Sequence, residues 1–158
     1  MSTLLKPSSQ SVFAPSKSLY GKKIAILVSE WHLELTEAMY LAAIKVLEES
    51  NLGFLFFREN VPGSYELSLA AQFMAKKDEV DAVICLGCVI QGETRHFDFI
   101  CNAVANGITE VSLKYNKPIS FGVITANTLV QAQERAGGKY GNKGEEAAWA
   151  AIKMLNLA

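Results

Sequence analysis

Residues 87–98 hold side chains that could perform acid–base and phosphate chemistry. A hydroxyl, a guanidinium and an imidazole follow one another at Thr94, Arg95 and His96. Imidazole titrates closer to neutral pH than other side chains, so it can both accept and donate protons in a reaction. The glycines of this segment leave backbone N–H groups open to an anion. We therefore expect a phosphate-handling active site here.

The elements on either side of this segment support that expectation. Residues 80–86 form an apolar run typical of a buried strand, and residues 99–115 carry apolar side chains at helical spacing. A polar segment between a strand and a helix is where α/β folds place ligands, at the positive end of the helix. The residue pattern alone also allows the other interpretation, in which His96 makes a solvent hydrogen bond at a helix start.

The rest of the chain repeats this alternation of strand and helix. Further strands are predicted at residues 23–29, 54–57 and 119–124, and further helices at 35–49, at 66–77, from 128 to a stop at Gly137, and after residue 144. Apolar strands alternating with helices predict a parallel sheet between helix layers. We expect a three-layer α/β/α sandwich with a four-stranded parallel sheet.

Composition excludes some classes of function. The 158 residues have a net charge of −1, with half of them hydrophobic, so nothing indicates binding to nucleic acid or to an anionic membrane. No apolar run approaches the ~20 residues that span a bilayer. Residues 1–21 are predicted to form a mobile N-terminal arm, and residues 22–158 a single domain. The lysines and serines of the arm resemble those of a transit peptide, but arginine and a cleavage site are lacking.

The three cysteines predict a reduced, cytoplasmic protein. Cys85 and Cys88 match the C-x-x-C pattern, but redox sites place the first cysteine at a helix start, whereas Cys85 lies inside a strand. A zinc site would need a second pair of ligands, and only His32 and His96 are available. We therefore expect buried strand cysteines and no metal.

Five other residues each allow a functional and a structural interpretation. Trp31 could stack on a planar heterocycle or belong to the core. Glu66 could bind a polyol or complement a helix dipole, and Arg135 could bind phosphate or complement a helix end. Phe121 is a core residue unless its strand end is shared with another subunit. Lys143 lies in a glycine-rich loop, residues 137–144, that does not match a P-loop.

Three blocks of the sequence together resemble the 6,7-dimethyl-8-ribityllumazine synthase family. They are residues 61–66, residues 87–98, and residues 121–125 continuing to 133–144. The resemblance implies a flavodoxin-like fold and a transferase of riboflavin biosynthesis that uses neither metal nor organic cofactor. Its substrates would be 5-amino-6-(D-ribitylamino)uracil and 3,4-dihydroxy-2-butanone 4-phosphate, and its products the lumazine, phosphate and water.

The resemblance also implies a role for individual residues. His96 takes the position of the general acid and base, and Trp31 that of the aromatic residue stacked on the pyrimidine. The other implied substrate-binding residues are Ser64, Tyr65 and Glu66 for the ribityl chain and ring edge, Cys88, Val89 and Ile90 for the pyrimidine through backbone groups, Glu93 and Thr94 for the phosphate loop, and Phe121, Arg135 and Lys143. Of the last three, Phe121 and Arg135 match residues that the family supplies from a neighbouring subunit.

Family members are pentamers or shells of twelve pentamers, so the resemblance implies a homo-oligomer with active sites at subunit interfaces. The uninterrupted turn at residues 137–144 favours the icosahedral capsid, and the arm could add to a neighbour's sheet. Riboflavin synthase is a candidate partner. Glu30, His32 and Gln91 depart from the family's usual residues. A non-catalytic flavin or lumazine carrier, or a shell protein of the same fold, is the alternative function.

Overall fold

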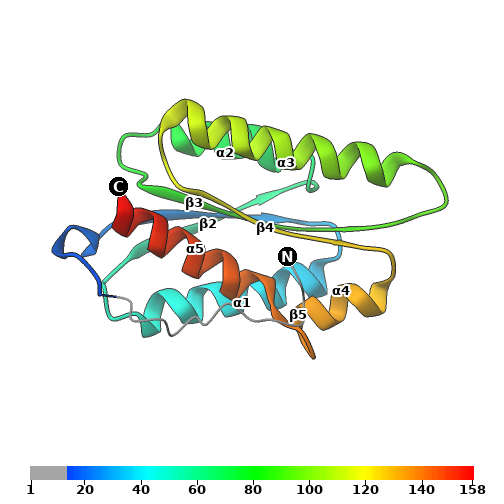
Figure 1. The fold of residues 1–158 in the computed structure, drawn as a ribbon, viewed down its shortest axis with the longest axis horizontal. Coiled ribbons are helices and arrows are strands. Elements are labelled where there is room, and N and C mark those ends of the chain that lie inside the picture. The colour runs from blue at the N-terminus through cyan, green and yellow to red at the C-terminus, as the bar shows by residue number, and fades with distance from the viewer. Residues whose placement is uncertain (1–13) are drawn as a thin grey trace.

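A parallel β-sheet lies between two layers of helices in the computed structural model, which describes residues 14–158 (Figure 1). The strands of this sheet are β1 (Lys23–Ser29), β2 (Leu55–Val61), β3 (Ala82–Ile90) and β4 (Ile119–Ala126). They lie in the order β2-β1-β3-β4, and each neighbouring pair is parallel. The predicted three-layer sandwich with a four-stranded parallel sheet is confirmed.

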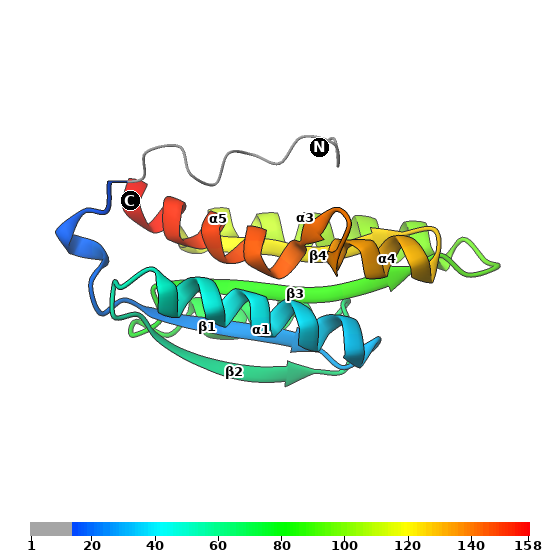
Figure 2. The ribbon, with the colours of Figure 1, turned by 90° about the horizontal axis from the view of Figure 1, so that it is seen from below.

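The helices divide unequally between the two faces of the sheet (Figures 1 and 2). One face is covered by α2 (Leu67–Ala75) and α3 (His96–Tyr115), and the other by α1 (Leu33–Glu49), α4 (Leu129–Arg135) and α5 (Lys143–Leu157). None of the helices within residues 14–158 is long and apolar enough to cross a membrane.

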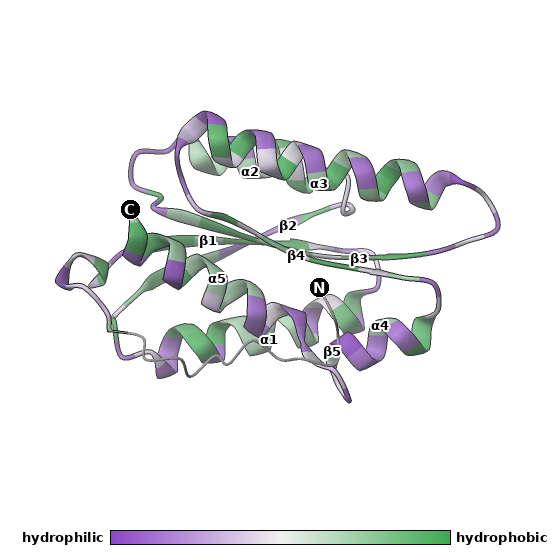
Figure 3. Ribbon diagram, viewed as in Figure 1, coloured by the Kyte–Doolittle hydropathy of each residue, from purple (hydrophilic) through white to green (hydrophobic). Residues whose placement is uncertain are grey.

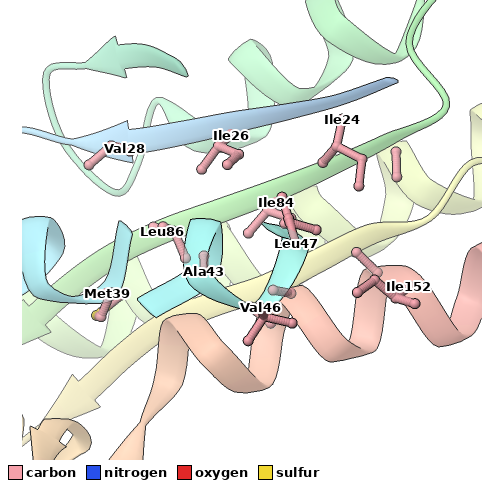
Figure 4. Packing of buried hydrophobic residues seen from close by; sticks show 14 of the residues in the cluster. Ile24, Ile26, Val28, Met39, Ala43, Val46, Leu47, Ile84, Leu86 and Ile152 are labelled. Carbon is pink, nitrogen blue, oxygen red and sulfur yellow. The ribbon is translucent and has the colours of Figure 1, made fainter. Parts of the chain in front are cut away.

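The sheet buries apolar side chains on both faces, as a fully covered parallel sheet requires. Ile24 and Ile26 of β1 point toward α1 and α5, where Ile152 packs against the same cluster (Figure 4). Ala25 and Leu27 alternate with them and join the cluster beneath α2 and α3. The strands are mainly apolar in Figure 3, whereas the helices also carry hydrophilic residues. Each fully buried isoleucine contributes roughly 1.5–3 kcal/mol to stability.

Three strands extend further than their apolar runs predict, and one of them is β4, which was expected at residues 119–124 but continues to Ala126. The second strand was expected at residues 54–57, but β2 continues through Arg58, Glu59 and Asn60. These polar residues are tolerated because β2 is an edge strand that is only partly covered. The third strand was expected to end at Leu86, but β3 continues to Ile90 and remains paired with β4 over this stretch. The loop that carries His96 therefore begins after residue 90, not at residue 87.

The segment after β4 contains a short hairpin that periodicity did not predict. The predicted cap is present, because Thr128 Oγ1 accepts a hydrogen bond from Gln131 N at 3.2 Å. The Gln131 side chain accepts from Asn127 N instead of from the cap residue itself. α4 ends at Arg135, before the expected glycine stop, because β5 (Ala136–Gly138) pairs antiparallel with β6 (Gly141–Asn142).

Part of the predicted N-terminal arm packs against the domain. Residues 1–13 lie outside the described residues. The 3₁₀ turn η1 (Lys17–Leu19) places Leu19, which is fully buried, in the core cluster under α1 and α5. Ser16 N donates to Asn156 Oδ1 at 2.7 Å, and Gly21 N donates to Leu52 O at 3.2 Å. Residues 14–21 are thus tied to α5 and to the α1–β2 turn.

Candidate active site

A pocket of about 680 Å³ opens at the carboxyl edge of the sheet, where parallel α/β folds bind ligands. It is bounded by the segment after β1, the turn between β2 and α2, the end of β3 and the start of α3. Its lining residues are Trp31, His32, Gly63, Ser64, Tyr65, Glu66, Cys88, Val89, Ile90, His96 and Ile100. Segments distant in sequence therefore meet in one site of a size suited to a small molecule.

Close packing against β3 fixes the turn between β2 and α2. Ser64 is only 6% exposed, and its hydroxyl donates a long hydrogen bond of 3.5 Å to Cys88 O. A Cβ placed on Gly87 would lie 2.6 Å from Ser64 Oγ and 3.0 Å from Leu67 Cδ1. Residue 87 must therefore be glycine for this turn to sit against β3 and present Tyr65 and Glu66 to the pocket.

The end of β3 presents to the pocket backbone groups that β1 does not pair with. β1 pairs with β3 only as far as Leu86, whereas β4 pairs with β3 up to Ile90. Gln91 N donates to Ala126 O of β4, and strand residues alternate in direction, so Cys88 and Ile90 direct their N–H and C=O groups away from β4. The Ser64 hydrogen bond to Cys88 O confirms this direction. A planar ligand beside β3 can form strand-like hydrogen bonds with these groups.

Trp31 lies on the open side of the pocket and is 70% exposed, so it is not a core aromatic residue. A Cβ on Gly63 would lie 3.3 Å from Trp31 Cδ1 and 3.1 Å from Glu66 Oε2. The indole and the Glu66 carboxylate therefore both approach the turn at Gly63. An exposed indole beside a carboxylate can stack on a heterocycle whose polar substituent the carboxylate binds.

His96 is the first residue of α3 and is exposed at the pocket. Its backbone N–H donates to Thr94 Oγ1 at 3.4 Å, and the preceding Arg95 gives α3 no side-chain cap. The first N–H groups of a helix have no intrahelical partner and favour an anion. Glu93 and Thr94 lie in the exposed loop that leads to His96 and are not among the pocket-lining residues.

The C-x-x-C cysteines are unsuited to redox or nucleophilic chemistry. Burial raises the pKa of the Cys85 thiol to about 12 and that of the Cys88 thiol to about 11. Both thiols are therefore protonated at neutral pH, and the prediction of buried strand cysteines is confirmed. No cluster of three or more potential metal ligands occurs within residues 14–158.

A second polar cluster lies in the other helix layer, at the α4–α5 junction. Arg135 donates to Tyr140 O and to Glu146, with an N–O distance of 2.8 Å to the carboxylate. Lys143 Nζ lies 3.3 Å from the same carboxylate, and the Arg135 and Lys143 side chains are only 19% and 17% exposed. Two cations share one carboxylate, so the cluster keeps one net positive charge.

Packing between α1 and α5 holds this cluster in place. A Cβ on Gly144 would lie 1.9 Å from Met39 O, so only glycine allows this approach. The Asn142 side chain caps α5 by accepting from Gly144 N at 2.8 Å and donates to Ala38 O at 3.1 Å. The loop between Arg135 and Lys143 is therefore anchored to α1.

The structure brings eight of the thirteen predicted site residues together in the pocket. These are Trp31, Ser64, Tyr65, Glu66, Cys88, Val89, Ile90 and His96. Phe121 lies opposite Cys85 on β4, below the pocket level, and packs on the core under α2 and α3. Arg135 and Lys143 lie on the opposite helix layer. None of these three lines the pocket of its own chain.

Sequence reasoning did not identify three of the lining residues, His32, Gly63 and Ile100. Ile100 belongs to an apolar helical stripe, which predicted only a core role. His32 was considered as a zinc ligand and as a departure from a family pattern, but not as a pocket residue. The signal that could have identified it was its place beside Trp31 at the end of the first strand.

Comparison with known proteins gives consistent matches over this domain. The sequence model of the family described as 6,7-dimethyl-8-ribityllumazine synthase matches residues 21–158. A 6,7-dimethyl-8-ribityllumazine synthase of Cytophaga hutchinsonii is 59% identical over 139 residues, which are 87% of each chain. Proteins of the same name from Parabacteroides distasonis and Porphyromonas gingivalis are each 46% identical over 136 residues, covering 85% of this chain and 85% and 84% of theirs.

Proposed function

The chain belongs to the 6,7-dimethyl-8-ribityllumazine synthase family, and from this premise we propose how its residues divide the work of the reaction. The enzyme is a transferase of riboflavin biosynthesis. It condenses 5-amino-6-(D-ribitylamino)uracil with 3,4-dihydroxy-2-butanone 4-phosphate, giving 6,7-dimethyl-8-ribityllumazine, phosphate and water. The 5-amino group condenses with the ketone to form a Schiff base and releases water. Phosphate then leaves by elimination, and tautomerisation of the product gives a new carbonyl. The ribityl-bearing nitrogen attacks this carbonyl and closes the ring with loss of a second water.

The pyrimidine binds between Trp31 and the end of β3. The exposed indole stacks on the ring, and the open backbone groups of Cys88 and Ile90 pair with the ring's amide edge. Val89 is paired with Thr125 of β4 and also lines the pocket. A uracil edge carries alternating N–H and C=O groups, which match the groups that a strand presents.

The ribityl chain binds at the turn between β2 and α2. Glu66 accepts hydrogen bonds from the ribityl hydroxyls, since an ionised carboxylate is an acceptor only. Tyr65 can donate to or accept from the same hydroxyls. Ser64 connects the ribityl site to the pyrimidine site, because its hydroxyl links the turn to Cys88 O of β3.

His96 transfers the protons that each step releases or requires. It lines the same pocket as Trp31 from a different element, the start of α3, where we place the meeting of the ketone substrate with the 5-amino group. A positioned acid or base contributes ~10²–10⁴-fold to a rate, and holding two reactants together contributes much of the remainder.

The phosphate group needs a cation that the pocket of one chain does not supply. Among the described residues that line the pocket, none is lysine or arginine. Glu93 and Thr94 position the loop whose N–H groups meet the phosphate, together with the start of α3. Arg135 of a neighbouring subunit supplies the guanidinium, with Lys143 beside it, and Phe121 of that subunit closes the pyrimidine pocket.

The enzyme therefore works as a homo-oligomer with active sites between subunits. We propose a pentamer, with twelve pentamers forming an icosahedral shell, because the turn at residues 137–144 carries no insertion. Riboflavin synthase, which consumes the lumazine, is the expected partner enzyme. All three cysteines are free thiols, which supports a reducing compartment, the cytoplasm.

The observation that carries this proposal is the convergence of Trp31, Glu66 and His96 on one pocket beside the open edge of β3. The test is incubation of the protein with both substrates while lumazine fluorescence is recorded. Formation of lumazine well above the uncatalysed background is expected. A wild-type rate equal to the background would contradict the proposal.

In Arg135→Ala, the KM for the phosphorylated substrate should rise more than the KM for ribitylaminouracil.

A further inference from the structure

The hydroxyl of Ser29 is buried and has no hydrogen-bond partner among residues 14–158. Ser29 is the last residue of β1, and its exposed fraction is 0%. Buried hydroxyls that lack a protein partner are uncommon and are usually satisfied by an ordered water. Two other serines, Ser68 and Ser120, share this property, but only Ser29 stands at the carboxyl end of a strand.

Ser29 lies at the point where the turn of the proposed ribityl site leaves the sheet. Side chains alternate along a strand, so Ser29 faces the same side of the sheet as Ala25 and Leu27, which pack under α2 and α3. Ser29 is paired with Val61, the last residue of β2 before the turn. Glu30 N also donates to Val61 O at 2.9 Å, so the end of β1 is tied to the start of the turn.

Gly87 lies beside Ser29 on the neighbouring strand. The register that pairs β1 with β3 ends one residue before each of them. Gly87 faces α2 and α3 as well, because Cys85, two residues earlier, belongs to the cluster on that side. The space above Gly87 is occupied by Ser64, whose Oγ would lie 2.6 Å from a Cβ at residue 87. The hydroxyls of Ser29 and Ser64 therefore meet at the same level of β3.

The Ser64 hydroxyl can take a further hydrogen bond. It donates a long bond of 3.5 Å to Cys88 O, and its oxygen can still accept. Ser29 Oγ does not bond to it directly. A water that accepts from Ser29 Oγ and donates to Ser64 Oγ satisfies the first hydroxyl and fixes the second. Ser64 lines the pocket, whereas Ser29 lies outside the set of lining residues.

We propose that one buried water joins the Ser29 hydroxyl to the Ser64 hydroxyl, and that Ser29 is thereby a positioning residue for 5-amino-6-(D-ribitylamino)uracil. This inference rests on the proposed function. Ser29 does not touch the substrate. It acts through Ser64, which holds the turn that presents Tyr65 and Glu66 to the pocket. The butanone phosphate, which we place beside His96, does not depend on this link.

The test is calorimetric titration with ribitylaminouracil alone in wild type and Ser29→Ala. Alanine removes the hydroxyl and keeps the Cβ, so the strand should form as before. The Kd should rise about 3–10-fold, as expected for the loss of one hydrogen bond that holds the turn. The KM for the butanone phosphate and kcat, measured at saturating ribitylaminouracil, should each change less than about two-fold.

Ser120→Ala is the matched control. Ser120 is also buried, and its hydroxyl also has no partner among the described residues. It lies near the start of β4, opposite Ile84, and faces the cluster under α1 and α5 on the other side of the sheet. The same substitution at this position should leave the Kd for ribitylaminouracil at the wild-type value.

The double variant of Ser29→Ala and Ser64→Ala tests whether Ser29 acts through Ser64. Loss of the Ser64 hydroxyl already breaks the link, so the Kd of the double variant should lie within about two-fold of that of Ser64→Ala. A crystal structure of wild type should also show one water at about 2.7–3.0 Å from both hydroxyl oxygens.

The inference is overturned if Ser29→Ala binds ribitylaminouracil as wild type does, or if Ser120→Ala weakens binding equally. It is also overturned if the effects of the two variants multiply in the double variant, if the KM values of both substrates rise together, or if no water bridges the two serines. Failure of wild type to form lumazine would instead contradict the proposed function, so the two failures are distinguishable.

Discussion

His96 and Arg135, which carry the proposed proton transfer and phosphate binding, are held by the fold in opposite ways. The His96 side chain is exposed at the start of α3, and only its backbone is hydrogen-bonded, to Thr94. Arg135 is mostly buried and is bound by Tyr140 O and Glu146. Substitution of His96 therefore changes the chemistry alone, whereas substitution of Arg135 also leaves Glu146 with one cation fewer.

Replacing His96 with alanine should lower kcat by ~10²–10⁴-fold through loss of the proton-transfer group. The melting temperature should stay close to that of wild type, because no described contact of the fold depends on the imidazole. Steady-state kinetics and thermal unfolding measure the two effects. A stable variant that retains most of its kcat would show that His96 is not the acid or base.

The buried thiols make stability depend on pH under alkaline conditions. The pKa of Cys85 is raised from 9.0 to about 12, so the folded state retains a proton that the unfolded state loses between these values. The contribution of this thiol to the free energy of unfolding should therefore be fully present below pH 9 and be lost as pH rises from 9 toward 12. The contribution of Cys85 to this slope is up to about 1.4 kcal/mol per pH unit.

Denaturant unfolding of Cys85→Ala at several pH values checks this slope. The variant should lose less stability than wild type between pH 9 and 11, even if its stability at pH 7 is lower. Cys101→Ala is the matched control, because that thiol is only partly buried and its removal should flatten the slope less. If stability falls with pH equally steeply in wild type and in Cys85→Ala, the alkaline loss of stability does not come from the Cys85 thiol.

At the scale of single residues, the sequence singled out several positions that line one pocket of the chain. Trp31 and His96 were candidates by residue type and position and again by the resemblance, and both line this pocket. Sequence reasoning did not identify His32 as a pocket residue, because a histidine beside an aromatic residue has no characteristic spacing. The roles of Phe121 and Arg135 stay predictions, because they depend on a neighbouring chain that one sequence does not position.

At the scale of elements, the site depends on how β3 meets the turn between β2 and α2. β3 extends beyond the end of β1 in the sheet. The last residues of β3 therefore have a neighbouring strand, β4, on one side only. The turn reaches this edge only because Gly87 has no side chain. Strand length and one close contact thus define the binding surface.

Replacing Gly87 with alanine should destabilise the protein by about 1–3 kcal/mol through overpacking against Ser64 and Leu67. The displaced turn should also raise the KM for ribitylaminouracil. Gly92→Ala is the stability control, because a Cβ at that position meets nothing within 4 Å. Denaturant unfolding that shows equal stability for both variants would contradict the close contact.

The existence and order of the main elements followed from hydrophobic periodicity, but several boundaries did not. The polar end of β2 was missed because an edge strand need not be apolar. The end of β3 was missed because Gly87 resembles a turn residue in sequence, although it serves close packing. The β5–β6 hairpin is too short to produce any periodic signal.

At the scale of the whole molecule, the groups that we propose to form one active site lie in two separate places on a single chain. The pocket contains the imidazole and the pyrimidine-binding groups, and the junction of α4 and α5 holds the paired cations in the other helix layer. Large apolar side chains such as Phe73, Phe99 and Leu113 are exposed on α2 and α3. Such exposure is typical of surfaces that another subunit covers.

Co-expression of His96→Ala with Arg135→Ala should raise activity above that of either variant alone, measured at a butanone phosphate concentration that Arg135→Ala uses poorly. The Arg135→Ala chain still carries the His96 imidazole, and the His96→Ala chain still carries the Arg135 guanidinium. Where the two chains are neighbours in a ring in the right order, the site between them is intact. Random assembly of equal amounts would give about a quarter of the wild-type sites. Activity per protomer and native mass measure this outcome. An absence of recovery in oligomers shown to contain both variants would place the whole site within one chain.

The open edge of β3 also bears on how this protein can change over generations. Every residue except proline has a backbone N–H and C=O, so other substitutions at Cys88 or Ile90 alter packing without deleting the groups that we propose to meet the ring. Such substitutions should therefore have little effect on the proposed recognition of the pyrimidine ring. The greater length of β3 relative to β1 is the property that this binding surface requires. That property depends on the whole sheet and not on any single residue.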